Sequence, residues 1–135
     1  MRGDAGLVLA EFCRMYSKIG AGLSIRNSEM NVLRIVCTKA GPHTPVQLSD
    51  MLGVSKPMVT MLINSLISQG FVAKVPSPED GRSFYVMPTK RGRALFDKAQ
   101  MEIDGFLGQI KSRLGRADFD NLIALIERAI DDGEN

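Results

Sequence analysis

Side chains that can contact DNA bases gather between residues 55 and 68 of this chain. Met58, Thr60 and Met61 can offer apolar contact to the methyl group of thymine, and Asn64 can reach a base edge or a phosphate. Lys56 is the only cation in this stretch, so bidentate reading of guanine by arginine is absent from it. The predicted contact residues here are Ser55, Lys56, Pro57, Met58, Thr60, Met61, Asn64 and Ser65.

A second group of predicted contacts opens a later helix. Lys90, Arg91 and Arg93 follow the capping residue Thr89, and no acid appears before Asp97. Cations at a helix N-terminus oppose the helix dipole, so a docked anion such as a backbone phosphate would explain them. The alternative is three solvated side chains, each costing only about a few tenths of a kcal/mol.

Residue types that support catalysis or metal binding are scarce. His43 is the only histidine, and there is no cluster of carboxylates to form an acid–base pair. Cys13 and Cys37 are far apart and lack neighbouring histidines or cysteines, which argues against a disulfide framework or a zinc site. We therefore expect no catalytic residues, no metal and no cofactor, and we do not expect an enzyme.

The contact residues need a scaffold, and residues 44–71 predict a helix-turn-helix. Thr44 with Pro45 and Gln47 forms a capping box for a first helix, which ends at Gly53. Ser55 caps the second helix, which Gly70 and Phe71 end. The apolar residues of that helix recur on one buried face, at Val59, Leu62, Ile63, Leu66 and Ile67. An ordinary two-helix hairpin in a helical domain is the alternative reading.

The apolar period changes from helical to alternating after residue 70. Phe71, Ala73 and Val75 are predicted on one face of a strand, and residues 83–87 alternate again after the turn-rich segment 76–81. This pattern predicts a β-hairpin with a long tip, and a recognition helix followed by such a hairpin indicates a winged helix-turn-helix.

The predicted hairpin carries its own DNA contacts, Lys74 and Arg82. Arg82 lies at the tip, where an extended arm can enter a minor groove. Asp80 can hold the guanidinium or the turn, and Gly81 allows a sharp tip. An unrelated surface hairpin would share the period but need not carry a cation there.

Four further helices are expected to surround this region. They cover residues 5–19, 29–40 with Ser28 as the cap, about 90–114, and about 117 onward. Apolar stripes over residues 9–19, 95–114 and 119–130 exceed what one winged domain can bury, so we expect a homodimer.

Composition is compatible with a protein that binds nucleic acid. The 135 residues suggest one domain, and the net charge of +2 divides into +3 over residues 1–42, +3 over 43–93 and −4 over 94–135. No run is apolar enough to span a membrane and no signal peptide is recognised, so a cytoplasmic protein is expected.

Nearly the whole chain resembles the MarR family of bacterial and archaeal transcription regulators. The specific parts are LSDMLGVSKPMVTMLINSLISQGFV at 48–72, Asp80-Gly81-Arg82, which is similar to the D-x-R wing motif, and residues 88–92, PTKRG, which resemble L-T-x-x-G. The resemblance implies a homodimer with interlocking terminal helices, recognition helices in successive major grooves and wing arginines in minor grooves. The chain departs from the family at Met61 and Ser65, where arginine is common.

The resemblance also implies regulation by a small-molecule effector or by thiol oxidation. Cys13 is the candidate redox residue, by similarity to the peroxide-sensing members. A buried core cysteine is the alternative for Cys13, and Cys37 is expected in the core.

These observations together predict a mainly α fold with a small β-hairpin wing (α+β). Residues 28–93 form the winged helix-turn-helix, and residues 1–27 and 94–135 form a helical dimerisation region of the same domain. The expected function is a sequence-specific transcriptional regulator, a repressor, that binds double-stranded DNA at a palindromic operator. A winged-helix protein-interaction module without specific DNA binding is the alternative.

Overall fold

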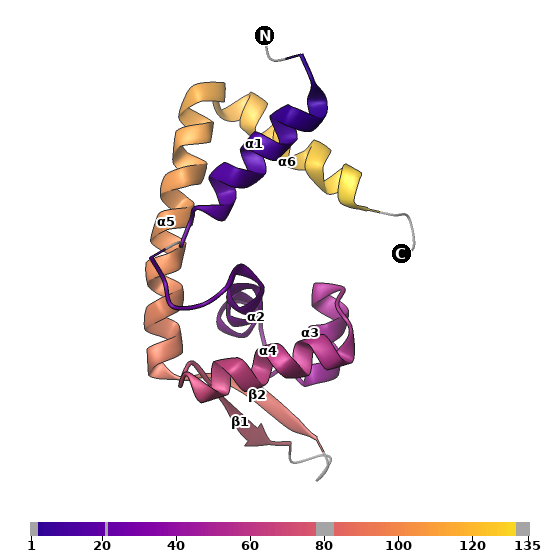
Figure 1. Cartoon of the computed structure of the whole chain (residues 1–135), viewed down its shortest axis with the longest axis vertical. Helices are drawn as coiled ribbons and strands as arrows, with labels where there is room; N and C mark the ends of the chain where they lie inside the picture. Colours follow the sequence, from indigo (N-terminus) through magenta and orange to yellow (C-terminus); the bar gives the residue numbers. More distant parts are fainter. Residues whose placement is uncertain (1–2, 21, 78–82, 132–135) are drawn as a thin grey trace. The chain divides into compact units, whose positions relative to one another are not determined.

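The computed structural model describes residues 3–20, 22–77 and 83–131 (Figure 1). Their helices and strands confirm the predicted mainly α fold with one antiparallel hairpin. The elements are α1 (Ala5–Ser17), α2 (Asn27–Thr38), α3 (Pro45–Leu52), α4 (Lys56–Ser68), β1 (Val72–Pro76), β2 (Phe84–Pro88), α5 (Lys90–Leu114) and α6 (Arg116–Ile130). The chain divides into two compact units, Met1–Gln100 and Met101–Asn135, and the boundary falls inside α5.

Capping residues begin the two helices of the predicted helix-turn-helix. Thr44 Oγ1 accepts a hydrogen bond from the Gln47 N–H at 3.2 Å, and Gln47 Oε1 accepts one from the Thr44 N–H at 2.9 Å. Ser55 Oγ accepts from the Met58 N–H at 3.2 Å, and Gly53 between the helices is left-handed, with φ of 66°. Both predicted helix starts are confirmed, since each cap satisfies an N–H that the helix leaves unpaired.

The end of α4 directs the chain into the hairpin. Gly70 has φ of +81°, and its N–H donates to the Ile67 carbonyl at 3.0 Å. The Phe71 N–H donates to the Leu66 carbonyl at 2.9 Å, which completes a Schellman motif. Phe71 is buried, so the end of α4 is packed into the core as well as hydrogen-bonded.

Three predicted helix boundaries are wrong by two residues. Helix α1 ends at Ser17 rather than at residue 19. Helix α2 begins at Asn27 and ends at Thr38, and Arg26 occupies the cap position instead of Ser28. The reason is Glu29, whose Oε1 accepts from the Arg26 N–H at 3.0 Å and therefore caps the helix from its third position.

The core of the first unit lies between α2, α3, α4, the hairpin and the first part of α5, which contributes Phe96 and Ala99. Leu33, Leu48, Ile63 and Leu66 have almost no solvent exposure. The strands pair from Val72↔Pro88 to Pro76↔Phe84, and the Val86 N–H donates to the His43 carbonyl at 2.8 Å. This contact ties the hairpin to the segment before α3. Figure 1 shows α2 above α4, with the hairpin projecting beyond α3 and α4.

The predicted alternation of buried and exposed residues along β1 is wrong. Phe71 and Val72 are both buried, whereas the residues from Ala73 to Pro76 are all exposed. The buried core contacts of the two strands are made by Val72 and Val86, and Ser77, which follows β1, is also buried. Only Val86 of β2 is buried.

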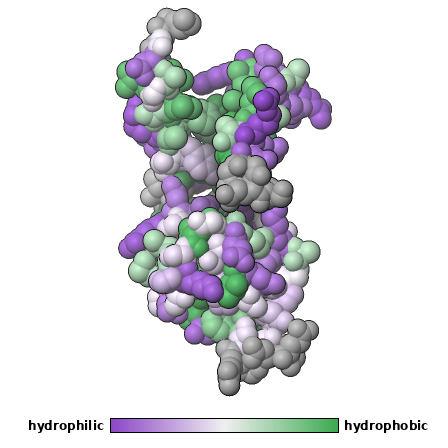
Figure 2. Space-filling view, turned by 90° about the vertical axis from the view of Figure 1, so that its right-hand side faces the viewer, coloured by the Kyte–Doolittle hydropathy of each residue, from purple (hydrophilic) through white to green (hydrophobic). Residues whose placement is uncertain are grey.

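Helices outside the winged region expose many apolar side chains. On α1 the exposed residues include Leu7 and Leu9, and Figure 2 shows the apolar surface of this helix in green below the grey N-terminal residues. On α6 they include Ile123, Leu125 and Ile126, and Ile130 is 75% exposed. Burying such surface is the main favourable term in protein association, so these faces are suited to binding another apolar surface.

No single helix in the described ranges is both long and apolar enough to cross a membrane. Helices α3 and α4 taken together pass that test of length and composition, although they meet at 113°.

Candidate nucleic-acid interface

The outer face of α4 carries most of the predicted base contacts. Its exposed side chains are Lys56, Pro57, Met58, Thr60, Met61 and Asn64, and the cap Ser55 is exposed as well. The opposite face is buried through Val59, Leu62, Ile63 and Leu66, as the helical period predicts. The helix therefore presents hydroxyl, amide, thioether and one ammonium group to solvent while its other side is held by the core.

Ser65 differs from its predicted orientation. It is half-buried, and its hydroxyl donates to Glu29 Oε2 at 2.6 Å. The side chain of Gln69, one turn further along α4, donates to the same oxygen at 3.1 Å. Helical spacing places residue 65 at the border between the two faces, and the buried carboxylate on α2 draws its hydroxyl inward.

Glu29 contacts α4 in a way that the sequence did not reveal. Burial alone would raise the pKa of its carboxyl, which is 4% exposed. The pKa nevertheless lies below its usual value, because the hydrogen bond from Ser65, the backbone and charge of Arg26, and the amide of Gln69 stabilise the ionised form. The signal in the sequence was Glu29 near the start of a helix, but nothing local shows its partners on α4.

A hollow of about 260 Å³ lies between α4 and the hairpin. It brings Thr60 and Asn64 of α4 next to Lys74 of β1, and Pro45, Ile63 and Phe84 complete its wall. The Lys74 ammonium lies 4.5 Å from the centre of the Phe84 ring, a cation–π contact that keeps the charge beside the recognition helix. Hydroxyl, amide and ammonium groups in one place are suited to binding the sugar and phosphate of a nucleotide.

The tip of the hairpin lies outside the described residues, and with it Asp80, Gly81 and Arg82. The described strands come together as predicted, and the Ser77 N–H donates to the Ser83 carbonyl at 3.3 Å. The role of Arg82 stays a prediction.

The start of α5 is tied to the end of α4. Thr89 Oγ1 accepts from the Gly92 N–H at 3.0 Å and donates to the Gly70 carbonyl at 2.6 Å. The Thr89 N–H donates to the Phe71 carbonyl at 3.1 Å. The predicted cap is therefore confirmed, and it also anchors the helix that carries the second group of cations.

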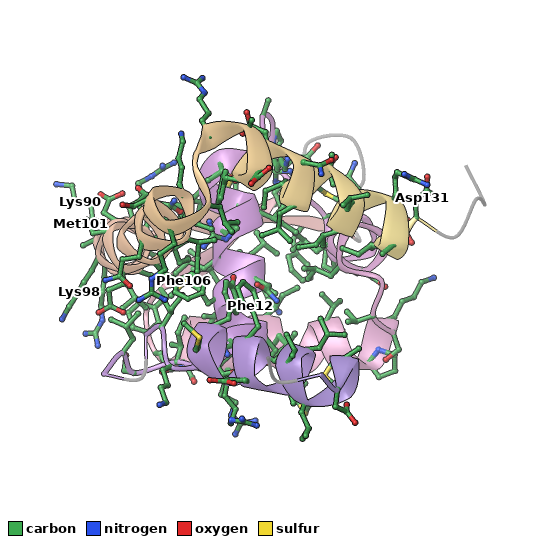
Figure 3. All side chains as sticks on the ribbon, turned by 90° about the horizontal axis from the view of Figure 1, so that it is seen from above. Phe12, Lys90, Lys98, Met101, Phe106 and Asp131 are labelled. Carbon is green, nitrogen blue, oxygen red and sulfur yellow. The ribbon has the colours of Figure 1, made fainter. Side chains whose placement is uncertain are left out.

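The cations of this turn are exposed. Figure 3 shows Lys90 on the outward side of α5, together with Lys98. Arg93 is also exposed, and the first turn of α5 holds no acid. The guanidinium of Arg91 lies 5.1 Å from the centre of the Phe71 ring, so a cation–π contact with the core orients it. Whether these residues bind phosphate stays a prediction.

The two cysteines differ in environment. Cys13 is exposed on α1 in the single chain, outside its core. Cys37 is half-buried, which raises the pKa of its thiol; the charge of Arg93 opposes the rise and that of Asp97 adds to it. Within the described ranges no group of three or more His, Cys, Asp or Glu residues could hold a metal ion.

The raised pKa of Cys37 leads to a testable expectation. In a Cys13→Ser variant, the pH midpoint for alkylation by iodoacetamide will be higher in the native protein than in urea, because only the thiolate reacts and burial disfavours it. The unfolded sample of the same variant is the control. Equal midpoints in the two samples would contradict this account of Cys37.

Comparison with known proteins agrees with this arrangement. The sequence model of the MarR family matches residues 21–83. Over 122 residues the chain is 26% identical to an uncharacterised helix-turn-helix-type transcriptional regulator of Mycobacterium bovis, and the match covers 90% of this chain and 85% of the relative.

Two solved structures share the fold. A mutant MarR from Escherichia coli complexed with operator DNA has a TM-score of 0.78 at 24% identity, covering 93% of this chain and 90% of that one. The PcaV regulator from Streptomyces coelicolor, in complex with its natural ligand, has a TM-score of 0.80 at 16% identity, covering 98% and 95%. With the winged helix-turn-helix described above, these findings support a MarR-family winged-helix transcriptional regulator.

Proposed function

We propose that this protein is a cytoplasmic transcriptional repressor that binds a palindromic operator sequence-specifically as a homodimer. A small ligand or oxidation of a thiol then releases it. The observation that carries the proposal is the exposed face of α4, which places Thr60 and Asn64 beside Lys74 while the opposite face is packed into the core. The similar regulator from E. coli, whose solved structure contains operator DNA, supports the same use of this surface.

The homodimer is supported by the exposed apolar faces of α1 and α6. Two copies related by a two-fold axis would present two recognition helices to two half-sites, and the operator would then be palindromic. Dimerisation also removes from water the apolar side chains that a single chain leaves exposed.

The two routes of release rest on separate observations. The similar structure of PcaV contains a natural ligand, which supports a small-molecule effector. The exposure of Cys13 supports an oxidisable thiol. Release of a bound duplex by peroxide in the wild type but not in Cys13→Ser would select the thiol, and release by a small molecule alone would select the ligand.

A protein-interaction module is the second candidate, and the composition of α4 favours it. Lys56 is the only cation of this helix, whereas Met58 and Met61 are exposed, Met61 to 57%. A face with little charge and exposed methionines is suited to apolar protein contacts as well as to thymine methyls.

Substitutions at Arg82 and Asn64 separate these two candidates. Arg82→Ala should weaken binding at all sites and reduce the salt dependence by about one charge per subunit. It should also erase any preference for flanking A·T pairs, whose narrow minor groove attracts arginine. Asn64→Ala should instead change which core sequence is chosen, at about 1–3 kcal/mol per lost base contact.

The measurement is fluorescence anisotropy at several salt concentrations, with a duplex selected from a random pool and a version with exchanged flanks. Arg113→Ala is the matched control, because it removes the same charge at the end of α5, outside the predicted contact residues. If Arg82→Ala keeps the affinity and the salt slope of the wild type, the hairpin is not a DNA-contacting wing. The protein-interaction module then becomes the better account.

A further inference from the structure

A buried carboxylate joins the recognition helix to the centre of the fold. Glu29 lies on α2, Ser65 and Gln69 lie at the C-terminal end of α4, and we name these three residues the Glu29 cluster. We infer that the Glu29 cluster is a positioning device: it sets the rotation of α4 on α2 and thereby controls base discrimination without touching DNA. The inference rests on the proposed function and adds a residue that acts through the recognition helix.

Both oxygens of Glu29 are occupied by donors from different elements. Oε2 accepts from Ser65 Oγ at 2.6 Å and from Gln69 Nε2 at 3.1 Å, and Oε1 accepts from the Arg26 N–H at 3.0 Å. Ser65 and Gln69 are four residues apart, so they project from the same side of α4. Gln69 Nε2 also lies 3.2 Å from Ser65 Oγ, which closes the cluster on itself.

These hydrogen bonds restrict the rotation of α4 about its own axis, which the apolar contacts restrict less. The buried face of α4 consists of Val59, Leu62, Ile63 and Leu66, whose contacts with the core are not directional. Hydrogen bonds to an ionised carboxylate are short, directional and stronger than neutral ones. Turning α4 would leave a buried charge without its donors, and this penalty favours one rotation.

The geometry of a helix converts such a rotation into lost base contacts. Side-chain ends lie about 5–6 Å from the helix axis, so a turn of about 10° moves them by about 1 Å. Asn64 directly precedes Ser65, and Thr60 lies one turn before Asn64, so both would move with the cluster. A shift of about 1 Å is enough to break a hydrogen bond to a base edge.

Phosphate contacts respond differently, and this difference separates a positioning role from a merely structural one. Binding to an unrelated sequence depends on charge and tolerates a small rotation of the helix. Binding to the selected sequence also needs the base edges. Losing the cluster should therefore lower the ratio of the two affinities and leave the affinity for the unrelated duplex nearly unchanged.

The test uses the full chain, a duplex selected from a random pool and a scrambled duplex of the same length and composition. Glu29→Gln should lower the ratio of affinities about tenfold, the size of losing one base contact. Gln69→Met removes one donor while keeping the length of the side chain, and it should lower the ratio less. Ser68→Ala is the matched control, because the Ser68 hydroxyl donates to the Ser65 carbonyl at 2.8 Å and not to Glu29.

A double-substitution cycle tests whether direct contact of Ser65 with DNA, instead of its bond to Glu29, accounts for the effect of Ser65 on the ratio of affinities. If Ser65 acts through Glu29, then Ser65→Ala and Glu29→Gln together will lower the ratio of affinities no more than the larger single substitution does. If the two residues act independently, the two losses of binding free energy will add. An unchanged ratio in Glu29→Gln, additive effects, or an equal loss of both affinities would overturn the inference. A wild type that does not distinguish the two duplexes would overturn the proposed function, and the inference with it.

Discussion

Replacing Gly92 by alanine will destabilise the protein more than any other glycine-to-alanine change in α5. A Cβ at residue 92 would lie 2.0 Å from the carbonyl oxygen of Phe71 and 2.9 Å from its carbonyl carbon. It would also lie 3.3 Å from Leu33 Cδ1. Backbone atoms cannot move aside as a flexible side chain can, so we expect a loss of about 3 kcal/mol or more in the free energy of unfolding.

The surroundings of Gly92 leave little room for relaxation. The Phe71 carbonyl accepts from the Thr89 N–H, and Thr89 Oγ1 accepts from the Gly92 N–H. Moving α5 away from Phe71 would therefore break the cap and displace the Lys90 and Arg91 side chains. For this reason we also expect any Gly92→Ala protein that folds to bind DNA more weakly.

Gly105→Ala and Gly108→Ala are matched controls in the same helix. Apart from its chain neighbours and the adjacent backbone of α5, a Cβ at either residue would meet no atom of the chain within 4 Å. Alanine favours a helix over glycine, so these variants should be stabilised by up to about 1 kcal/mol. Urea unfolding of the three variants gives the comparison, and a Gly92→Ala protein as stable as Gly108→Ala would refute the close-contact argument.

Introducing aspartate at both Leu122 and Ile126 is expected to dissociate or unfold the protein. The two residues lie four apart on the apolar face of α6, beside exposed Ile123 and Ile130. If this face is buried in a homodimer, each new carboxylate must either lose its water or separate the subunits. Leaving a charge buried without a partner costs several kcal/mol, which is comparable with the stability of a whole domain.

Sedimentation velocity at micromolar concentration, with circular dichroism on the same samples, measures this effect. Asn121→Asp with Ala124→Asp is the matched control, because it adds the same charge to the opposite side of α6 and should leave the dimer intact. A wild type that sediments as a well-folded monomer at that concentration would remove the basis for the dimer.

Local sequence signals determined the positions of the helices and turns. The Thr44, Ser55 and Thr89 caps hydrogen-bond to residues three positions away, and Gly70 ends α4 through bonds within the same turn. Such interactions depend on neighbours in sequence, so they can be read without the fold. The buried face of α4 was predictable for the same reason, since helical period alone separates it from the outer face.

Tertiary structure decided how those elements are held against one another. Ser65 turns inward because Glu29, which is 36 residues away in sequence, lies opposite it on α2. In β1 only Val72 is buried, because it is the one residue of this strand that packs on the core. Gly92 is needed because the Phe71 backbone passes close to α5. Each of these contacts joins segments that are distant in the chain. Local periodicity and capping residues do not predict which partner a side chain will contact once the core has formed.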